Sequence, residues 1–395
     1  MSGNSVRSLL VYVHFPYCLK KCPYCDFASY PATADRIDHV RYADAIIAEL
    51  GLRAGSIPAD AELASVFFGG GTPSLWEPKE LGRALKAIRA AVPRERGDLE
   101  VTVECNPSSF DERRASAMLD QGVNRVSIGI QSLDSERLAF LGRLHDADGG
   151  LEALRAAMRA GFTRVSGDLI FGVQGGRPQT SQAASCEVDR VAETGVRHLS
   201  AYGLTIESGT QFGELHRKGR LPVATDDVVV DSFFAIEEAL TARGFSHYEI
   251  SNYAVPGEEA RHNLGYWRGA DYLGLGCAAV GTMSRADGTA LRHKNHPDPG
   301  RYMKGVFAGA PTLAEEEVLS AEMRLQERIM LGLRLERGLD LAEAGRALGV
   351  DPFTPERRAA IDRLAASNRL LVEGSHLRVA PQARALTDGI VAALF

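Results

Sequence analysis

The chain has 395 residues, of which 45% are hydrophobic and 24% are charged, as in an ordinary globular protein. Its net charge of −6 argues against a broad nucleic-acid-binding surface, so we expect no nucleic-acid partner. No run approaches the roughly 20 apolar residues that a membrane span needs, and residues 9–13 are too short for a secretory signal. Six cysteines, three of them clustered, favour a cytoplasmic protein over a secreted disulfide framework. Peripheral membrane contact and the oligomeric state stay open.

Short β-branched runs alternate with helical patterns through the first two-thirds of the chain. We expect strands at 9–13, 65–68, 99–104, 125–130, 164–170 and 198–204. We expect helices at 41–53, 78–91, 111–121, 151–160, 181–193 and 228–243. Such alternation predicts parallel strands joined by right-handed crossovers. Six units are too few for a closed eight-stranded barrel, so we predict an α/β fold, a partial (β/α)6 barrel, over residues 1–244.

The pattern changes from residue 245. Residues 247–253 predict a strand, and the loop at 297–311, rich in Pro and Gly, predicts a boundary. We therefore divide the rest of the chain into a segment at 245–311 and a C-terminal domain at 312–395. Helices expected at 320–335, 339–348 and 355–367, followed by a hairpin of 370–373 and 377–379, indicate a mainly helical, winged-helix-like appendage.

Polar residues follow the predicted barrel strands at the points where the strands end. In barrel enzymes these ends converge on the face where the chemistry occurs. We therefore expect one cavity to be ringed by residues at the strand ends and by Asp168, which the fifth strand carries. The residues at the strand ends are Cys18–Cys25, Gly69–Pro73, Glu104–Pro107, Gln131, Thr205 and Glu207.

The first strand runs into a C-x3-C-x2-C triplet formed by Cys18, Cys22 and Cys25. Three thiolates on one short loop can bind three irons of a [4Fe-4S] cluster and leave the fourth iron open to a small molecule. A structural zinc site needs four closed ligands; His14 could supply a fourth, but it precedes the loop. The spacing therefore favours an iron–sulfur cluster over zinc or inert thiols.

The run around the triplet resembles that of radical S-adenosylmethionine (SAM) enzymes, and more narrowly their coproporphyrinogen-oxidase-like branch. Tyr12-x-His14-x-Pro16 precedes the triplet, and Tyr24 stands just before Cys25. The resemblance implies a radical-SAM barrel whose cluster, held by the three cysteines, chelates SAM through its open iron and receives an electron from a donor protein. It implies SAM contacts from Tyr12 and Tyr24, and it does not fix whether SAM is cleaved or only bound.

Further SAM positions are implied by the same resemblance. A glycine run can expose its N–H groups to a ligand, but a tight strand–helix turn explains Gly69-Gly70-Gly71 equally well on its own. Lone Glu, Gln, Arg or Asp residues at strand ends are also weak signals. In their contexts, however, the runs GGGTP, VECNP, GIQSL, LGR and GDLIFG match the SAM-contacting segments of the family in order. The residues so implied are Gly70, Gly71, Thr72, Glu104, Gln131, Arg143 and Asp168.

His262 stands in the run HNLGYW. A histidine in an aromatic stretch is more often a packed, hydrogen-bonded residue than a metal ligand. The HNxxYW pattern nevertheless resembles the haem-linked segment of HemW-type haem chaperones, which implies haem as a cofactor and His262 as its candidate ligand. Two segments depart from the family: Ala278–Gly281 after Cys277 lacks the usual histidine, and Gly172–Gln179 replaces a shorter turn that contains proline.

The resemblance covers roughly residues 9–394 and leaves two activities. The oxygen-independent coproporphyrinogen III dehydrogenase uses the radical for oxidative decarboxylation, whereas the haem chaperone binds a cluster, SAM and haem and delivers haem to acceptor haemoproteins. Asp26-Phe27 in place of a further cysteine, the early first strand and the HNLGYW run favour the haem chaperone. No catalytic residue is assigned. A non-catalytic, zinc-binding interaction protein is the alternative outside this family.

Overall fold

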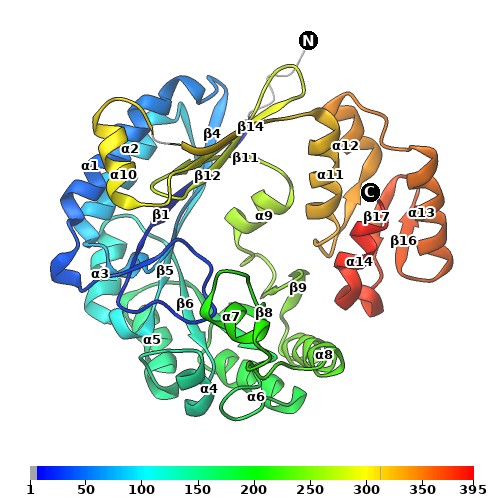
Figure 1. Ribbon diagram of the computed structural model, residues 1–395, viewed down its shortest axis with the longest axis horizontal. Coiled ribbons are helices and arrows are strands. Elements are labelled where there is room, and N and C mark those ends of the chain that lie inside the picture. Colours follow the sequence, from blue (N-terminus) through cyan, green and yellow to red (C-terminus); the bar gives the residue numbers. More distant parts are fainter. Residues whose placement is uncertain (1–6, 312) are drawn as a thin grey trace.

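Six parallel strands form the centre of a twelve-stranded sheet in the computed structural model, which describes residues 7–311 and 313–395 (Figure 1). Residues 1–6 and residue 312, where two of the predicted domains begin, lie outside the described residues. The six strands are adjacent in chain order. They are β1 (Arg7–Phe15), β4 (Ala61–Gly70), β5 (Arg94–Cys105), β6 (Arg125–Gln131), β7 (Arg164–Phe171) and β8 (His198–Gly203). The predicted partial (β/α)6 barrel is confirmed.

Helices surround the convex face of this sheet (Figure 1). The longer helices bury one apolar stripe each; in α2, for example, Leu81, Leu85 and Ile88 recur at helical spacing and are all buried. The helices are α1 (His39–Arg53), α2 (Pro78–Ala91), α3 (Glu112–Asp120), α4 (Ser135–Phe140), α5 (Ala147–Ala160), α6 (Ser181–Ala192) and α8 (Asp226–Ala242). The short helix α7 (Gln211–Arg217) instead packs beside the cysteine loop, where the Phe212 amide donates to the Pro23 carbonyl.

Strands from residues 246–319 extend the sheet at both ends. Next to β8 lie β10 (Asn252–Ala254) and β9 (Ser246–Glu249), so the single strand predicted at 247–253 is wrong, because the chain reverses at residues 250–251. Next to β1 lies β11 (Asp271–Leu275), which is parallel to β1. Three antiparallel strands complete this edge: β12 (Val280–Ser284), β13 (Ala290–Asn295) and β14 (Leu313–Leu319).

The loop predicted at 297–311 is also wrong, since it contains α10 (Pro299–Phe307). Its prolines and glycines suggested irregular backbone, but Pro299 stands in the first turn, where a missing N–H costs nothing. The Asp298 carboxylate accepts a hydrogen bond from the Arg301 amide at 2.7 Å and caps the helix.

The C-terminal part of the chain packs around a hydrophobic cluster of its own, centred on Leu325, Ile329, Leu341 and Leu377. The predicted helices and hairpin are present there. The elements are α11 (Ala321–Gly332), β15 (Leu339–Asp340), α12 (Leu341–Leu348), α13 (Pro355–Ala366), β16 (Leu370–Glu373), β17 (His376–Val379) and α14 (Thr387–Ala392). The division of the chain at residues 244 and 311 stays a prediction.

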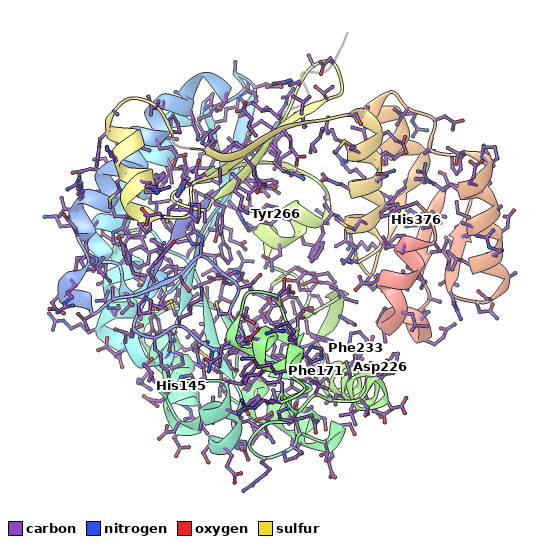
Figure 2. All side chains as sticks on the ribbon, in the orientation of Figure 1. His145, Phe171, Asp226, Phe233, Tyr266 and His376 are labelled. Atoms are coloured by element: carbon purple, nitrogen blue, oxygen red, sulfur yellow. The ribbon has the colours of Figure 1, made fainter. Side chains whose placement is uncertain are left out.

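The short helix α9 (Arg261–Trp267) lies between the barrel sheet and α11 (Figure 1). Figure 2 shows Tyr266 on this helix. The buried Glu100 carboxylate accepts hydrogen bonds from the first amides of α9, those of Arg261 and His262. Within residues 7–311 and 313–395, no helix has the length and apolar character to cross a membrane.

Candidate SAM and iron–sulfur site

A cavity of about 530 Å³ lies inside the barrel and is lined by residues from each of the six barrel strands or the loop behind it. Alternation along the strands explains the lining: in β6 the side chains at 125, 127 and 131 face the cavity, whereas those at 126, 128 and 130 join the core under the helices. The predicted convergence of strand ends is confirmed, because the cavity is lined by Cys18, Cys22, Cys25, Gly70–Thr72, Glu104–Asn106, Gln131, Asp168, Thr205 and Glu207.

Backbone hydrogen bonds fix the position of the cysteine loop. Its start, β2 (Tyr17–Cys18), pairs with β3 (Tyr30–Pro31), and the Cys25 amide donates to the Cys22 carbonyl at 3.2 Å. All three cysteines are free thiols. Burial raises the pKa of the Cys18 and Cys25 thiols. The backbone thus holds three thiols at one cavity wall, with Tyr24 beside them in the lining.

Tyr12 does not line the cavity but supports the cysteine loop from behind. His14 Nε2 lies 2.9 Å from the Ala28 carbonyl, which can only accept, so Nε2 carries the proton. His14 Nδ1 therefore accepts from the Tyr12 hydroxyl at 3.0 Å. These two hydrogen bonds connect the end of the cysteine loop to β1. Gly70 packs against the same ring, since a Cβ on Gly70 would come within 2.5 Å of a His14 ring atom.

The glycine segment is joined to the cysteine loop by backbone hydrogen bonds. The Gly71 amide donates to the Phe15 carbonyl at 2.7 Å, and the Thr72 amide donates to the Tyr17 carbonyl at 2.8 Å. The Thr72 hydroxyl in addition donates to Cys18 Sγ at 3.4 Å. A Cβ on Gly71 would approach the Tyr17 carbonyl oxygen to 2.7 Å, so only glycine fits there.

Glu104 faces the cavity from the end of β5 and accepts a hydrogen bond from the Gly70 amide at 3.0 Å. Burial, together with the Asp168 carboxylate, raises the Glu104 pKa to about 7. Burial also raises the pKa of Asp168, whose carboxylate accepts from the Ser127 hydroxyl at 2.7 Å and from the Ser166 hydroxyl at 3.0 Å. Both groups can hydrogen-bond a polar ligand in the cavity.

Gln131 and Arg143 close the cavity beside the cysteines. Gln131 has a φ of 70°, in the left-handed region that a glutamine seldom adopts, at an irregularity in the pairing of β6 with β7. Arg143 donates to the Gly129 carbonyl at 2.7 Å and lies 3.6 Å from Cys22 Sγ. Its Nε is buried and has no hydrogen-bond partner among the described residues.

The unusual segment 172–179 supports this corner of the cavity. Gln179 is buried and accepts from the Gly172 amide at 2.9 Å while donating to Glu187 at 2.6 Å. Glu187 in turn accepts from Ser132, the residue after Gln131, at 2.6 Å. The segment therefore links β7 and α6 to the strained end of β6. A Cβ on Gly175 would overlap the Phe140 ring at 2.0 Å, so glycine lets the loop pack on α4.

His262 is fully buried and does not line the cavity. Its Nδ1 lies 2.7 Å from the Ser65 hydroxyl, and its ring stacks on Phe67, which does line the cavity. Its Nε2 has no hydrogen-bond partner among the described residues. Burial lowers the His262 pKa to about 3, so the imidazole is neutral. Residues 277–281, where the family histidine is lacking, lie outside the cavity lining.

Several polar residues of the lining were missed by the sequence-based predictions. They come from the start or middle of the strands rather than from the ends, and they are Thr102, Arg125, Ser127, His198 and Ser200. Their signal is the period of two: in the run RVSIGIQ of β6, polar or small residues alternate with apolar ones. Such alternation inside a parallel sheet, which is usually apolar on both faces, indicates a polar interior.

The donor set fits a [4Fe-4S] cluster with SAM. Three free thiols share one cavity wall, and the unpartnered Arg143 Nε beside them suits a carboxylate. Among the described residues, no three His, Cys, Asp or Glu side chains are grouped to hold a single metal ion. Three cysteines that bind three different irons need no such grouping, so the arrangement gives no support to a zinc site.

Comparisons with known proteins agree with this geometry. Residues 12–179 match the Radical SAM superfamily, and residues 319–386 match the HemN C-terminal domain. The protein "Heme chaperone HemW" of Mycobacterium tuberculosis strain H37Rv is 36% identical over 389 residues, which cover 97% of this chain and 94% of that protein. The chain belongs to the HemW family of radical SAM proteins.

Two further comparisons extend this result. "Heme chaperone HemW" of Escherichia coli K12 is 37% identical over 300 residues, 76% of each chain. Among solved structures, coproporphyrinogen III oxidase (HemN) of Escherichia coli superposes with a TM-score of 0.80 and covers 98% of this chain and 90% of its own, at 21% identity. This likeness shows that the two proteins share the fold.

Proposed function

We propose that this protein is a haem chaperone, which binds a [4Fe-4S] cluster, SAM and haem and delivers haem to acceptor haemoproteins. The observation that carries the proposal is the match to relatives that are named heme chaperones, one of which covers 97% of this chain. An electron donor for the cluster belongs to the proposal, as does the absence of a nucleic-acid partner.

The cavity residues divide between the two smaller cofactors. Cys18, Cys22 and Cys25 would hold three irons of a cluster that, when bound, would supply the electron for a reductive cleavage of SAM. Arg143 offers its unpartnered Nε to a carboxylate, and Gly70–Thr72 approach the ligand closely because the glycines carry no side chain. Glu104 and Asp168 suit hydroxyl and amino groups, and Gln131 and Tyr24 complete this wall.

His262 is the proposed haem ligand, and its hydrogen bond supports that role. Metal-bound histidines usually donate their other ring N–H to a neighbour, and Ser65 lies 2.7 Å from Nδ1. Nε2 is then the unprotonated nitrogen, which carries the lone pair that an iron needs. Because this nitrogen is enclosed by Phe67 and Tyr266, among others, haem binding requires α9 and its neighbours to rearrange.

An activity assay separates the chaperone from the oxidase with the same fold. We expect the anaerobically reconstituted protein, given reductant, SAM and coproporphyrinogen, to form no protoporphyrinogen above the level of a Cys18→Ala control. The same preparation loaded with haem should pass the haem to an acceptor apo-haemoprotein. Substantial protoporphyrinogen that depends on Cys18 would contradict the proposal and favour the dehydrogenase.

A further inference from the structure

The cavity extends well beyond the cluster end of the barrel. Arg125 begins β6 and Gln131 ends it, so at about 3.3 Å per residue their Cα atoms lie about 20 Å apart along the strand. Both residues line the cavity. Apart from Asp168 in the middle of β7, the residues proposed to hold the cluster and SAM occupy the strand ends and the loops after them. The inner end, around Arg125, has no role in that arrangement.

One layer of the sheet supplies the polar groups of this inner end. The strand register places Phe67, Thr102, Arg125 and Arg164 side by side on β4, β5, β6 and β7. The first three of these residues line the cavity. Thr102 is 2% exposed, and its buried hydroxyl has no hydrogen-bond partner among the described residues. A buried hydroxyl of this kind costs stability unless a ligand satisfies it.

Arg125 is also 2% exposed. Its charge acts on the Asp168 carboxylate, where it opposes the rise in pKa that burial causes, but the two groups form no ion pair. Its neighbour Arg164 forms ion pairs with Glu100 and Glu258, at 3.0 and 3.4 Å. Arg125 itself, among the described residues, makes one hydrogen bond, to the Glu258 carbonyl at 3.3 Å, and no ion pair. A guanidinium has five N–H donors, so most of them stay available toward the cavity.

The other charged groups of the cavity do not occupy these donors. The Asp168 carboxylate is held by the Ser127 and Ser166 hydroxyls, and Glu104 by the Gly70 amide. His198, which also lines the inner end, is kept neutral, since burial and the nearby Arg125 and Arg164 charges lower its pKa. A buried, unpaired cation beside an unpartnered hydroxyl is a recognition site for an anion.

We propose that Arg125 and Thr102 form a carboxylate-binding subsite at the inner end of the barrel cavity, and that it takes a propionate arm of haem. The assignment of haem rests on the proposed function. The cavity volume of about 530 Å³ is in the range of about 300–1,000 Å³ that holds one small-molecule ligand, so a macrocycle does not fit there beside SAM and only an arm of haem would enter. Ala260 and Asn263, which flank α9 residue His262 in the chain, line the same cavity and place the subsite next to the proposed iron ligand.

The test compares haemin with its dimethyl ester, which lacks both propionate charges, by titration monitored in the Soret band. Wild-type protein should bind haemin more tightly than the ester. Arg125→Gln should weaken haemin binding about tenfold or more and leave ester binding unchanged, because a hydrogen bond to a charged group is lost. Thr102→Val, which keeps the side-chain shape, should weaken haemin binding by a smaller factor.

Two controls make the result specific. Arg197→Gln removes one positive charge from an exposed residue that also pairs with Glu258, and it should leave haemin affinity unchanged. Because Thr102→Val removes a buried unpartnered hydroxyl, the ligand-free variant should melt no lower than wild type even though it binds haemin less well.

Three results would overturn the subsite: equal losses for haemin and ester, no loss for either, or a loss of SAM affinity alone in Arg125→Gln. The last result would assign Arg125 to the SAM site instead. Failure of wild-type protein to bind haemin at all is a separate outcome, and it would overturn the proposed function together with this assignment.

Discussion

Glu104 is one of several buried polar residues of this cavity that lower the stability of the ligand-free protein and can bind a ligand. Its carboxyl group is enclosed by the barrel and accepts one hydrogen bond among the described residues, from the Gly70 amide. Burial raises its pKa from 4.5 to about 7. The Arg143 Nε and the Thr102 hydroxyl are likewise buried and without partners among the described residues. Polar groups left in this state are what a binding site offers to its ligand.

The Glu104 pKa predicts a pH dependence of stability. The folded protein holds a proton on Glu104 between about pH 4.5 and 7 that the unfolded chain releases, so the free energy of unfolding falls as the pH rises through this window. Glu104→Gln should remove that fall and raise the unfolding free energy at pH 8 by up to about 3 kcal/mol, while changing it little near pH 5. Urea unfolding of the cluster-free protein at both pH values measures this. An equal change at pH 5 and pH 8 would contradict the assigned pKa.

At the scale of elements, the sequence predicts the repeating units well because their patterns are local. The β-branched runs and the amphipathic stripes mark all six barrel strands and the longer helices of the barrel, but the short helices α4 and α7 were not predicted. The errors lie where tertiary pairing decides. The strand predicted at 247–253 is two strands, β9 and β10, because the chain reverses and pairs with itself, and α10 forms in a loop-like run because Asp298 and Pro299 begin a helix there.

The segment 172–179 gives a prediction at this scale. Gly175→Ala should lower the free energy of unfolding by about 1–3 kcal/mol, because the added methyl group overlaps the Phe140 ring. This ring packs against the Phe212 ring, with 4.7 Å between the two ring centroids. Gly51→Ala in α1 meets no atom within 4 Å and should instead raise it by about 0.5–1 kcal/mol. Urea unfolding of both variants tests the pair. If Gly175→Ala is as stable as wild type, the loop does not pack on α4 as described.

For the whole molecule, the convergence of strand ends on one cavity could be predicted from strand order alone. The inner end of the cavity could not, because Thr102, Arg125 and His198 become neighbours only through the register of separate strands. The placement of His262 was also beyond the sequence. Its run suggests a ligand, whereas its burial behind Phe67 depends on how α9 fits against β4.

Haem binding by the reconstituted protein is the most direct test of the central claim. Anaerobic titration of the cluster-loaded protein with haem, with and without SAM, should show saturable binding of one haem per chain while the cluster absorption persists. His262→Ala should alter the Soret band and weaken binding, whereas His145→Gln, a half-buried histidine that also has an unpartnered ring nitrogen among the described residues, should not. A wild-type protein that binds its cluster and SAM but shows no saturable haem binding would contradict the proposed haem-chaperone function.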